Sequence, residues 1–335
     1  MKRLQSISSL YGISTKETVV DVTQKIEFAV QCGKDAQLVA DNPLDEVQAW
    51  GTLAIALQLS GSDNAAVVDA FLNAVGCSRK LSVEEVREEQ VVPLGLFVQT
   101  AKLLLQGGRY NQARTILLYG CTIYTSATLF MLLGVCYLRL DELDDAEVAL
   151  VEANLLDNRN SSVWAYLCLV CLASGPHRMV EAEKSLEQTL RLGQEDSQIL
   201  RELATSFMSV DKLQTAEDLI RRALRKEALE AGGGSSTSTA GASNRYTSNA
   251  RTRRLLADIL AGQNQAVKAV DEYQLVIADE TADVKTKLEA CERCSVLLSS
   301  LGREEELLTL KNIINALTAA EQDSSSGNNT TTALE

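Results

Sequence analysis

The chain has 335 residues, a formal net charge of −13 and an isoelectric point of about 4.8. Nucleic acid and anionic membrane surfaces are therefore not expected as partners, because both favour a basic footprint. Apolar residues make up 46 % of the sequence, aromatic residues only 4 %, and there are three prolines, which favours helices over many short strands. No apolar run reaches the roughly 18 residues of a membrane span, and the N-terminal stretch lacks the apolar core of a secretory signal. We expect a cytoplasmic protein whose partners are other proteins.

The first elements in chain order form an N-terminal helical segment over residues 1–43, with one or two helices predicted within 14–41. The segment closes with Asp41-Asn42-Pro43, which resembles the end of a repeat unit like those that follow. We therefore interpret residues 1–43 as containing a partial repeat, and we expect the repeat array to begin before its first clear copy.

Residues 44–229 contain an internal repeat with a period of about 34 residues. Its clearest copy reads F-x2-LG-x2-Y from Phe130, followed by A-x3-L-x2-A from Ala146. Further copies begin at Trp50, Phe97, Trp164 and Leu200, and turns are predicted at Gly107-Gly108, Asp141–Leu143, Gly175-Pro176 and Val210–Lys212. This is the tetratricopeptide repeat (TPR) pattern, in which W-x2-LG-x2-Y precedes A-x3-F-x2-A.

The positions of small and large residues explain why this pattern folds as helix pairs. Small residues such as Gly134 and Ala146 occur where two antiparallel helices cross most closely, and large residues such as Tyr137 and Trp164 fill the space between successive pairs. One pair cannot bury both of its faces, so the pairs must stack. The predicted fold class is all-α, a right-handed superhelical TPR solenoid of antiparallel helix pairs.

The remainder of the chain divides into three predicted segments. Residues 230–250 are rich in Gly, Ser and Thr, which predicts a flexible linker. Residues 251–318 are expected to form further TPR-like pairs, with a weaker copy from Leu256 and a last pair broken at Gly302. Residues 319–335 have the composition of a disordered tail.

No catalytic, cofactor-binding or metal-binding set is expected. His177 is the only histidine and follows Pro176 in a turn, which argues against a His-based triad or a His-rich metal site. The pairs Cys168-x2-Cys171 and Cys291-x2-Cys294 have the spacing of a zinc ribbon but lie far apart and inside predicted helices. We interpret them as packing thiols of a reducing compartment, and we predict that the protein is not an enzyme.

One basic cluster has two interpretations. Arg251, Arg253 and Arg254 follow the predicted linker and precede Leu255-Leu256. The cluster is either the start of a helix or a docking point for an acidic surface. The sequence favours the first interpretation and leaves the second open.

The predicted ligand-binding groove is the face of each first helix that points away from the small-residue seam. This face is mostly apolar in its middle, and it lacks the Lys/Asn/Arg set with which chaperone-binding TPR domains hold a terminal carboxylate. A helical or apolar segment of another protein is therefore the expected ligand. The alternative is that several of these side chains pack inside the array. The predicted lining residues are Val98, Met131, Val135, Leu138, Leu169, Leu172, Arg201 and Met208.

One stretch is more specific than the TPR pattern. It contains "GVCYLRLDEL" at Gly134–Leu143, "AEVALVEAN" at Ala146–Asn154 and "NRNSSVWAYLCLVCL" at Asn158–Leu172. Together with "EAEKSLEQTLRL" at Glu181–Leu192, this sequence resembles the C-terminal TPR region of the cilia and flagella associated protein 70 family. The resemblance is close over residues 125–195 and weaker over 45–125.

The resemblance implies a non-catalytic scaffold of the ciliary or flagellar axoneme that supports axoneme structure and motility. The family's large β-rich region before the array has no counterpart in this sequence, which fits a fragment, a divergent member or another TPR protein of the axoneme. The alternative function is a soluble cytosolic TPR adaptor in complex assembly or co-chaperone work.

Overall fold

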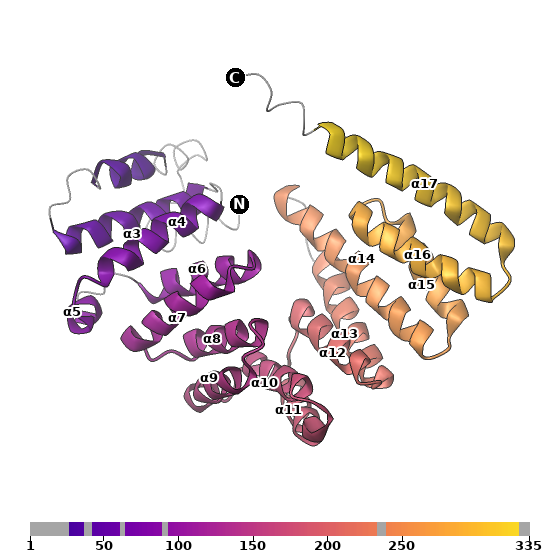
Figure 1. Ribbon diagram of the computed structural model, residues 1–335, viewed down its shortest axis with the longest axis horizontal. Helices are drawn as coiled ribbons and strands as arrows, with labels where there is room; N and C mark the ends of the chain where they lie inside the picture. Colours follow the sequence, from indigo (N-terminus) through magenta and orange to yellow (C-terminus); the bar gives the residue numbers. More distant parts are fainter. Residues whose placement is uncertain (1–26, 37–41, 61–63, 89–92, 233–238, 328–335) are drawn as a thin grey trace. The chain divides into compact units, whose positions relative to one another are not determined.

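The computed structural model describes residues 27–36, 42–60, 64–88, 93–232 and 239–327. Every regular element in these ranges is a helix (Figure 1), which confirms the predicted all-α class. The chain forms two compact units, Met1–Val170 and Cys171–Glu335, and the division falls inside one helix. Each unit is described by itself below.

The first unit contains a helix over residues 27–36 followed by labelled helices that continue to the dividing helix. Their bounds are α3 (Pro43–Ser60), α4 (Asn64–Ser78), α5 (Val83–Glu88), α6 (Leu94–Gln106), α7 (Tyr110–Ile123), α8 (Ala127–Arg139), α9 (Leu143–Leu156) and α10 (Ser161–Ala173). Helix α10 continues into the second unit, which then contains η1 (Pro176–Arg178), α11 (Met179–Arg191), α12 (Ser197–Ser209), α13 (Leu213–Gly232), α14 (Thr239–Gly262), α15 (Ala266–Ala278), α16 (Val284–Ser300) and α17 (Glu304–Gly327).

Most helices of the repeat pairs pack on their neighbours in sequence, as the repeat predicts. The pairs α8/α9 and α12/α13 are in extensive contact, and the first helices α12, α14 and α16 also contact one another in series. The small-residue seam is tight, because a methyl group built at Gly134 would lie 2.5 Å from Cγ of Leu150. Ala146, which lies on the same seam, is fully buried. The repeat positions therefore have the packing roles that the sequence assigns to them.

An aromatic cluster forms the centre of the first unit. The Phe97 ring meets the Phe71 ring edge-on, with 5.5 Å between centroids, and the rings of Tyr119 and Tyr124 lie 6.2 and 6.1 Å away. Phe71 and Phe97 are fully buried. Edge-on aromatic pairs add a favourable quadrupole term to their burial, so this cluster fixes α4, α6 and α7 against one another.

Five helix pairs share one turn geometry. A turn of three residues separates α6/α7, α8/α9, α12/α13, α14/α15 and α16/α17. In every case the middle residue has φ between +60° and +70°. The third residue of each turn donates its N–H to a carbonyl five positions back, as Lys212 does to Phe207 at 2.9 Å. This is the Schellman motif, which ends a helix by satisfying its last carbonyls. The middle residues are Gly108, Asp141, Asp211, Asn264 and Gly302.

We expect Asp211→Gly to raise the free energy of unfolding by about 0.5–1 kcal/mol, because a side chain at left-handed φ is strained and glycine is not. The reverse change at an equivalent position, Gly302→Ala, should lower it by about 1 kcal/mol. A methyl group at Gly302 meets no atom within 4 Å, so this cost would come from backbone strain alone. Urea unfolding followed by circular dichroism measures both changes. Equal effects of the same sign would contradict the turn assignment.

The Gly/Ser/Thr-rich segment differs from its prediction as a linker over residues 230–250. Helix α13 runs to Gly232 and α14 already begins at Thr239, so helix covers all of the segment that the structure describes. Alanines at 240, 242 and 250 support helix here. Likewise α17 continues to Gly327, beyond the start of the predicted disordered tail at 319. Residues 1–26, 37–41, 233–238 and 328–335, on which parts of these predictions fall, lie outside the described residues.

Candidate protein-binding surfaces

The structure places all eight residues of the predicted groove on first helices of pairs. Three of them are buried: the exposed fractions of Val135, Leu169 and Leu172 are 6 %, 5 % and 7 %. These three side chains pack inside the protein and offer little surface to a ligand, as the alternative interpretation of this face expected. Val98, Met131, Leu138, Arg201 and Met208 are half-buried.

The half-buried apolar residues of this set in the first unit also contact the core. Val98 on α6 and Met131 on α8 pack against the cluster around Phe97. Leu138 and Met131 both pack against a second cluster that includes Leu150 and Val163. Each of these side chains therefore stabilises the array while it still presents part of its surface to solvent, and this partial surface is what remains of the predicted groove.

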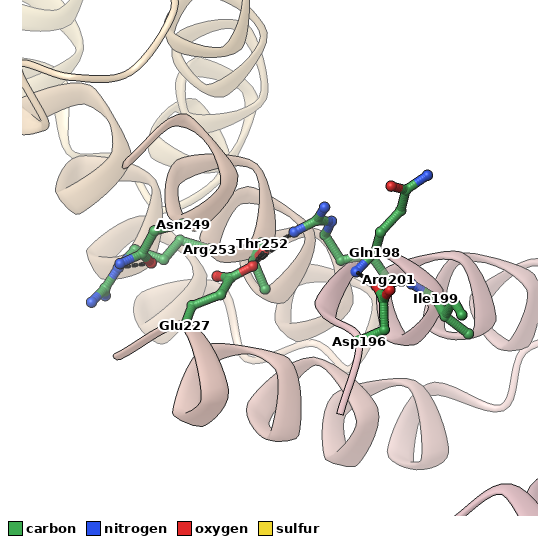
Figure 2. Close-up of polar contacts among 8 residues, drawn as sticks. All are labelled: Asp196, Gln198, Ile199, Arg201, Glu227, Asn249, Thr252 and Arg253. Atoms are coloured by element: carbon green, nitrogen blue, oxygen red, sulfur yellow. Dashed lines mark hydrogen bonds and ion pairs between the residues drawn. The ribbon is translucent and has the colours of Figure 1, made fainter. Parts of the chain in front are cut away.

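Arg201 on α12 belongs to a buried polar network rather than to an open groove (Figure 2). Its Nη1 lies 2.7 Å from Oε1 of Glu227 on α13 and donates to Oγ1 of Thr252 on α14 at 3.1 Å. The Thr252 hydroxyl in turn donates to the same Glu227 oxygen at 3.0 Å. The exposed fractions of the Arg201 and Glu227 side chains are 19 % and 6 %. The network therefore joins α12, α13 and α14, and it gives Arg201 a structural role that the groove prediction did not include.

Local hydrogen bonds set the helices that carry this network (Figure 2). Asp196 caps the N-terminus of α12, where its Oδ1 accepts from the backbone N–H of Gln198 at 2.8 Å and of Ile199 at 3.3 Å. Such a cap satisfies amide groups that have no partner inside the helix. On α14, Nε of Arg253 donates to Oδ1 of Asn249 at 3.2 Å. Both ends of the network thus lie on helices with ordered local polar contacts.

The basic cluster Arg251–Arg254 lies in the second half of α14 and is directed at carboxylates of its own chain. Arg253 pairs with Glu272 at 3.3 Å, Arg251 lies 3.7 Å from Asp283, and Arg254 pairs with Glu289. These partners lie on α15, on α16 and at the cap of α16. The arginines therefore hold successive helices together. The favoured interpretation of the cluster as the start of a helix is wrong, because α14 already begins at Thr239.

A second buried polar network lies nearby in the same unit. The Tyr273 hydroxyl on α15 donates to Asp258 on α14, and Arg293 on α16 pairs with the same carboxylate. Burial raises the pKa of Tyr273 above its ordinary value, and the hydrogen bond to Asp258 raises it further. The phenol is therefore a permanent donor at neutral pH, and the network serves helix packing rather than proton transfer.

The cysteines and the histidine do not assemble into a reactive site. Both C-x2-C pairs are buried, and burial raises the pKa of Cys291 and of Cys294 to about 11. His177 is exposed in η1. Among the residues that the structure describes, no group of three or more His, Cys, Asp or Glu side chains could hold a metal ion. Within the same residues, no helix is long and apolar enough to span a membrane.

Two surfaces on second helices escaped the sequence analysis. Helix α9 exposes Val148, Val151 and Leu155, which share one face of the helix. A cleft between α11 and α13 is lined by leucines and arginines. The cleft had a signal in "LIRRALRK" at Leu219–Lys226, which contains four basic residues, one more than Arg251–Arg254. That signal is only informative once α11 is known to form the opposite wall.

Comparison with known families gives one match that covers most of the chain. Residues 14–294 match the family model described as the cilia and flagella-associated protein 70 C-terminal domain. A stretch of 110 residues, 33 % of this chain, is 37 % identical to cilia- and flagella-associated protein 70 of Homo sapiens and of Macaca fascicularis. The matched stretch spans 10 % and 11 % of the length of these relatives.

Comparison with solved structures supports the fold. The chain is similar to one in the crystal structure of the APC/C hetero-tetramer Cut9–Hcn1, with a TM-score of 0.50 and 14 % sequence identity. The similarity covers 89 % of this chain and 54 % of that one. At this identity the likeness concerns the fold alone, which is of the all-α TPR type.

Proposed function

The chain belongs to the family of the cilia and flagella-associated protein 70 C-terminal domain, and from this premise we propose that it is a non-catalytic, protein-binding scaffold of the ciliary or flagellar axoneme. In this role it holds partner proteins on the surfaces of its helix pairs and supports axoneme structure and motility. The observation that carries the proposal is the family match over residues 14–294.

Three features of the described residues support a binding role over a chemical one. The helices form TPR-type pairs, an architecture that presents extended surfaces for protein ligands. The side chains of the polar networks around Arg201 and Asp258 pair with one another and hold helices together. The partly exposed apolar residues of the first helices, such as Leu138, and the exposed ones of α9 offer contact area for helical or apolar segments.

The decisive experiment is the location of a tagged copy in a ciliated cell. We expect the tag to lie along the cilium and to sediment with the axoneme after detergent extraction, because a scaffold is held by many protein contacts. Recovery of all the protein in the soluble fraction would contradict the axonemal role and favour the alternative, a cytosolic TPR adaptor. A tagged unrelated TPR protein is the control for non-specific sedimentation.

A variant of the same tagged copy tests the face of the first helices. Leu138→Lys places a charge on the half-buried surface of α8, and we expect it to reduce retention in the axoneme. Leu118→Lys makes the same change on α7, a second helix, where the side chain is 44 % exposed. Equal retention of the two variants would exclude this face as the main attachment site.

A further inference from the structure

The cleft between α11 and α13 combines an apolar floor with a basic edge. Its volume is about 690 Å³, and its floor includes Leu186 and Leu190 of α11 and Leu219 of α13. Leu186 and Leu190 are one helical turn apart and therefore share a face of α11. The cleft lies between two second helices, and none of its lining residues belongs to the face of the first helices discussed above.

Ion pairs connect the α11 and α13 sides of the cleft at two places. Nζ of Lys212, directly before α13, lies 3.2 Å from Oε1 of Glu183 on α11. Towards the other end of α13, Nζ of Lys226 lies 2.5 Å from Oε2 of Glu195, which follows α11. These two contacts connect α11, or the residues after it, with α13, or the residue before it.

The charge at the edge is predominantly positive. Arg221, Arg222 and Arg225 line the cleft, together with one carboxylate, Asp218. Arg221 pairs with Glu217 at 2.6 Å, and Nε of Arg225 donates to the Arg221 carbonyl. Within the described part of the chain, no ion pair or hydrogen bond engages the guanidinium of Arg222. The hydrogen bond from Lys226, and to a smaller extent the charge of Arg222, lowers the pKa of Glu195. A half-buried cation thus lines an apolar cleft on a chain of net charge −13.

From this combination we infer that the cleft binds an acidic amphipathic helix of a partner protein. Leucines on the ligand would fill the floor, as in other helix-in-groove complexes. Glu or Asp side chains beside them would pair with the half-buried Arg222, where the partly desolvated setting strengthens charge-assisted hydrogen bonds, and with the exposed Arg225. The inference rests on the protein-binding role proposed above, but neither on the axonemal location nor on the face of the first helices.

A second copy of the chain is the competing occupant. Helix α9 exposes Val148, Val151 and Leu155 beside the carboxylates of Asp144 and Glu152. This face has the chemistry that the cleft selects, so it could enter the cleft of another molecule. Such a head-to-tail contact would link successive copies, and it would show as a mass that rises with protein concentration.

The test uses the full chain and a fluorescent synthetic peptide of about 18 residues. The peptide carries Leu along one helical face and Glu on both sides of it, and a control peptide replaces every Glu by Lys. We expect the acidic peptide to bind in fluorescence anisotropy and the Lys peptide to bind at least about tenfold more weakly. Affinity for the acidic peptide should fall as salt rises from about 0.05 to 0.3 M.

Arg222→Glu should weaken binding of the acidic peptide about tenfold or more. Arg159→Glu is the matched control, because Arg159 is exposed in the turn before α10 and the net charge changes equally. Circular dichroism confirms that both variants remain folded. Equal affinities of the two variants, or equal binding of the two peptides, would overturn the inference.

Analytical ultracentrifugation without peptide tests the competing occupant. A monomer at all concentrations is expected. Concentration-dependent association that Arg222→Glu abolishes would replace the inference with self-assembly through α9. Peptide binding without retention in the axoneme would refute only the proposed location, whereas retention without peptide binding would refute only the cleft.

Discussion

Replacing Arg201 by alanine should lower the free energy of unfolding by about 3–5 kcal/mol, which is the largest effect we expect from any single substitution described here. The change removes the cation and leaves the Glu227 carboxylate, whose side chain is 6 % exposed, in a dry position without its charge partner. It also removes the hydrogen bond that the Thr252 hydroxyl oxygen accepts from Arg201 on α12. Urea unfolding measures the loss.

The positions of the three network residues predict which helices lose stability in Arg201→Ala. Arg201, Glu227 and Thr252 lie on α12, α13 and α14, so hydrogen exchange should accelerate in these helices, whereas α3–α7 remain protected. Replacing both charged partners, as in Arg201→Met with Glu227→Leu, should recover much of the stability, since a buried pair often has an apolar equivalent of similar stability.

Lys212→Ala is the matched control for this experiment. Its ion pair with Glu183 is exposed, at 48 % and 51 % of the side-chain surfaces, and exposed pairs contribute less than about 1 kcal/mol. If Arg201→Ala and Lys212→Ala had equal effects, the Arg201 pair would not be a buried determinant of stability. A double-mutant cycle over Arg201 and Glu227 separates their coupling from the loss of packing.

Gly134→Ala should lower the free energy of unfolding by about 1–3 kcal/mol. The added methyl group would lie 2.5 Å from Cγ of Leu150 and 3.2 Å from the carbonyl oxygen of Ala146. Leu150 is fully buried and the carbonyl belongs to the backbone of α9, so neither can move without separating α8 from α9. Urea unfolding and the exchange rates of α8 and α9 report the change.

Gly76→Ala provides the contrast. Gly76 lies within α4, and a methyl group built there meets no atom within 4 Å. Alanine has the higher helix propensity, so this substitution should stabilise the protein by up to about 1 kcal/mol. Opposite signs at the two glycines would show that close helix approach explains Gly134. If both substitutions stabilised the protein, close approach of the helices would not explain the glycine at position 134 of the repeat.

The sequence predicted the helix pairs because their determinants recur at fixed spacing. Gly134 and Ala146 mark the seam by their size, and the turn at Val210–Lys212 is marked by polar residues between two apolar patterns. These signals are local and recur along the chain, so each copy of the repeat supports the prediction of the other copies. The structure shows both features where the pattern placed them.

The surfaces were harder to predict because they depend on contacts between distant residues. Arg201 has the position of a groove residue within its own helix, but Thr252, 51 positions later, contributes to burying its charge. Leu169 and Leu172 resemble exposed apolar residues in the sequence, whereas both are buried in the structure. Helical periodicity identifies the faces of one helix, whereas it does not reveal which neighbouring side chains enclose a charge.

The segment at 230–250 illustrates a related limit. Its Gly, Ser and Thr content indicates weak structure, yet the flanking α13 and α14 pack on each other and share the Arg201 network. Tertiary contacts therefore position α13 and α14, and the composition of residues 230–250 does not report those contacts.

The dominance of contacts between sequence neighbours has a consequence for biosynthesis. Because α8 packs on α9, α12 on α13 and α14 on α15, each pair can bury apolar surface soon after its second helix leaves the ribosome. Loops closed by three-residue turns carry little entropic cost, and low contact order favours rapid folding. The chain can therefore mature from its N-terminus while translation continues, with few apolar faces waiting for segments not yet made.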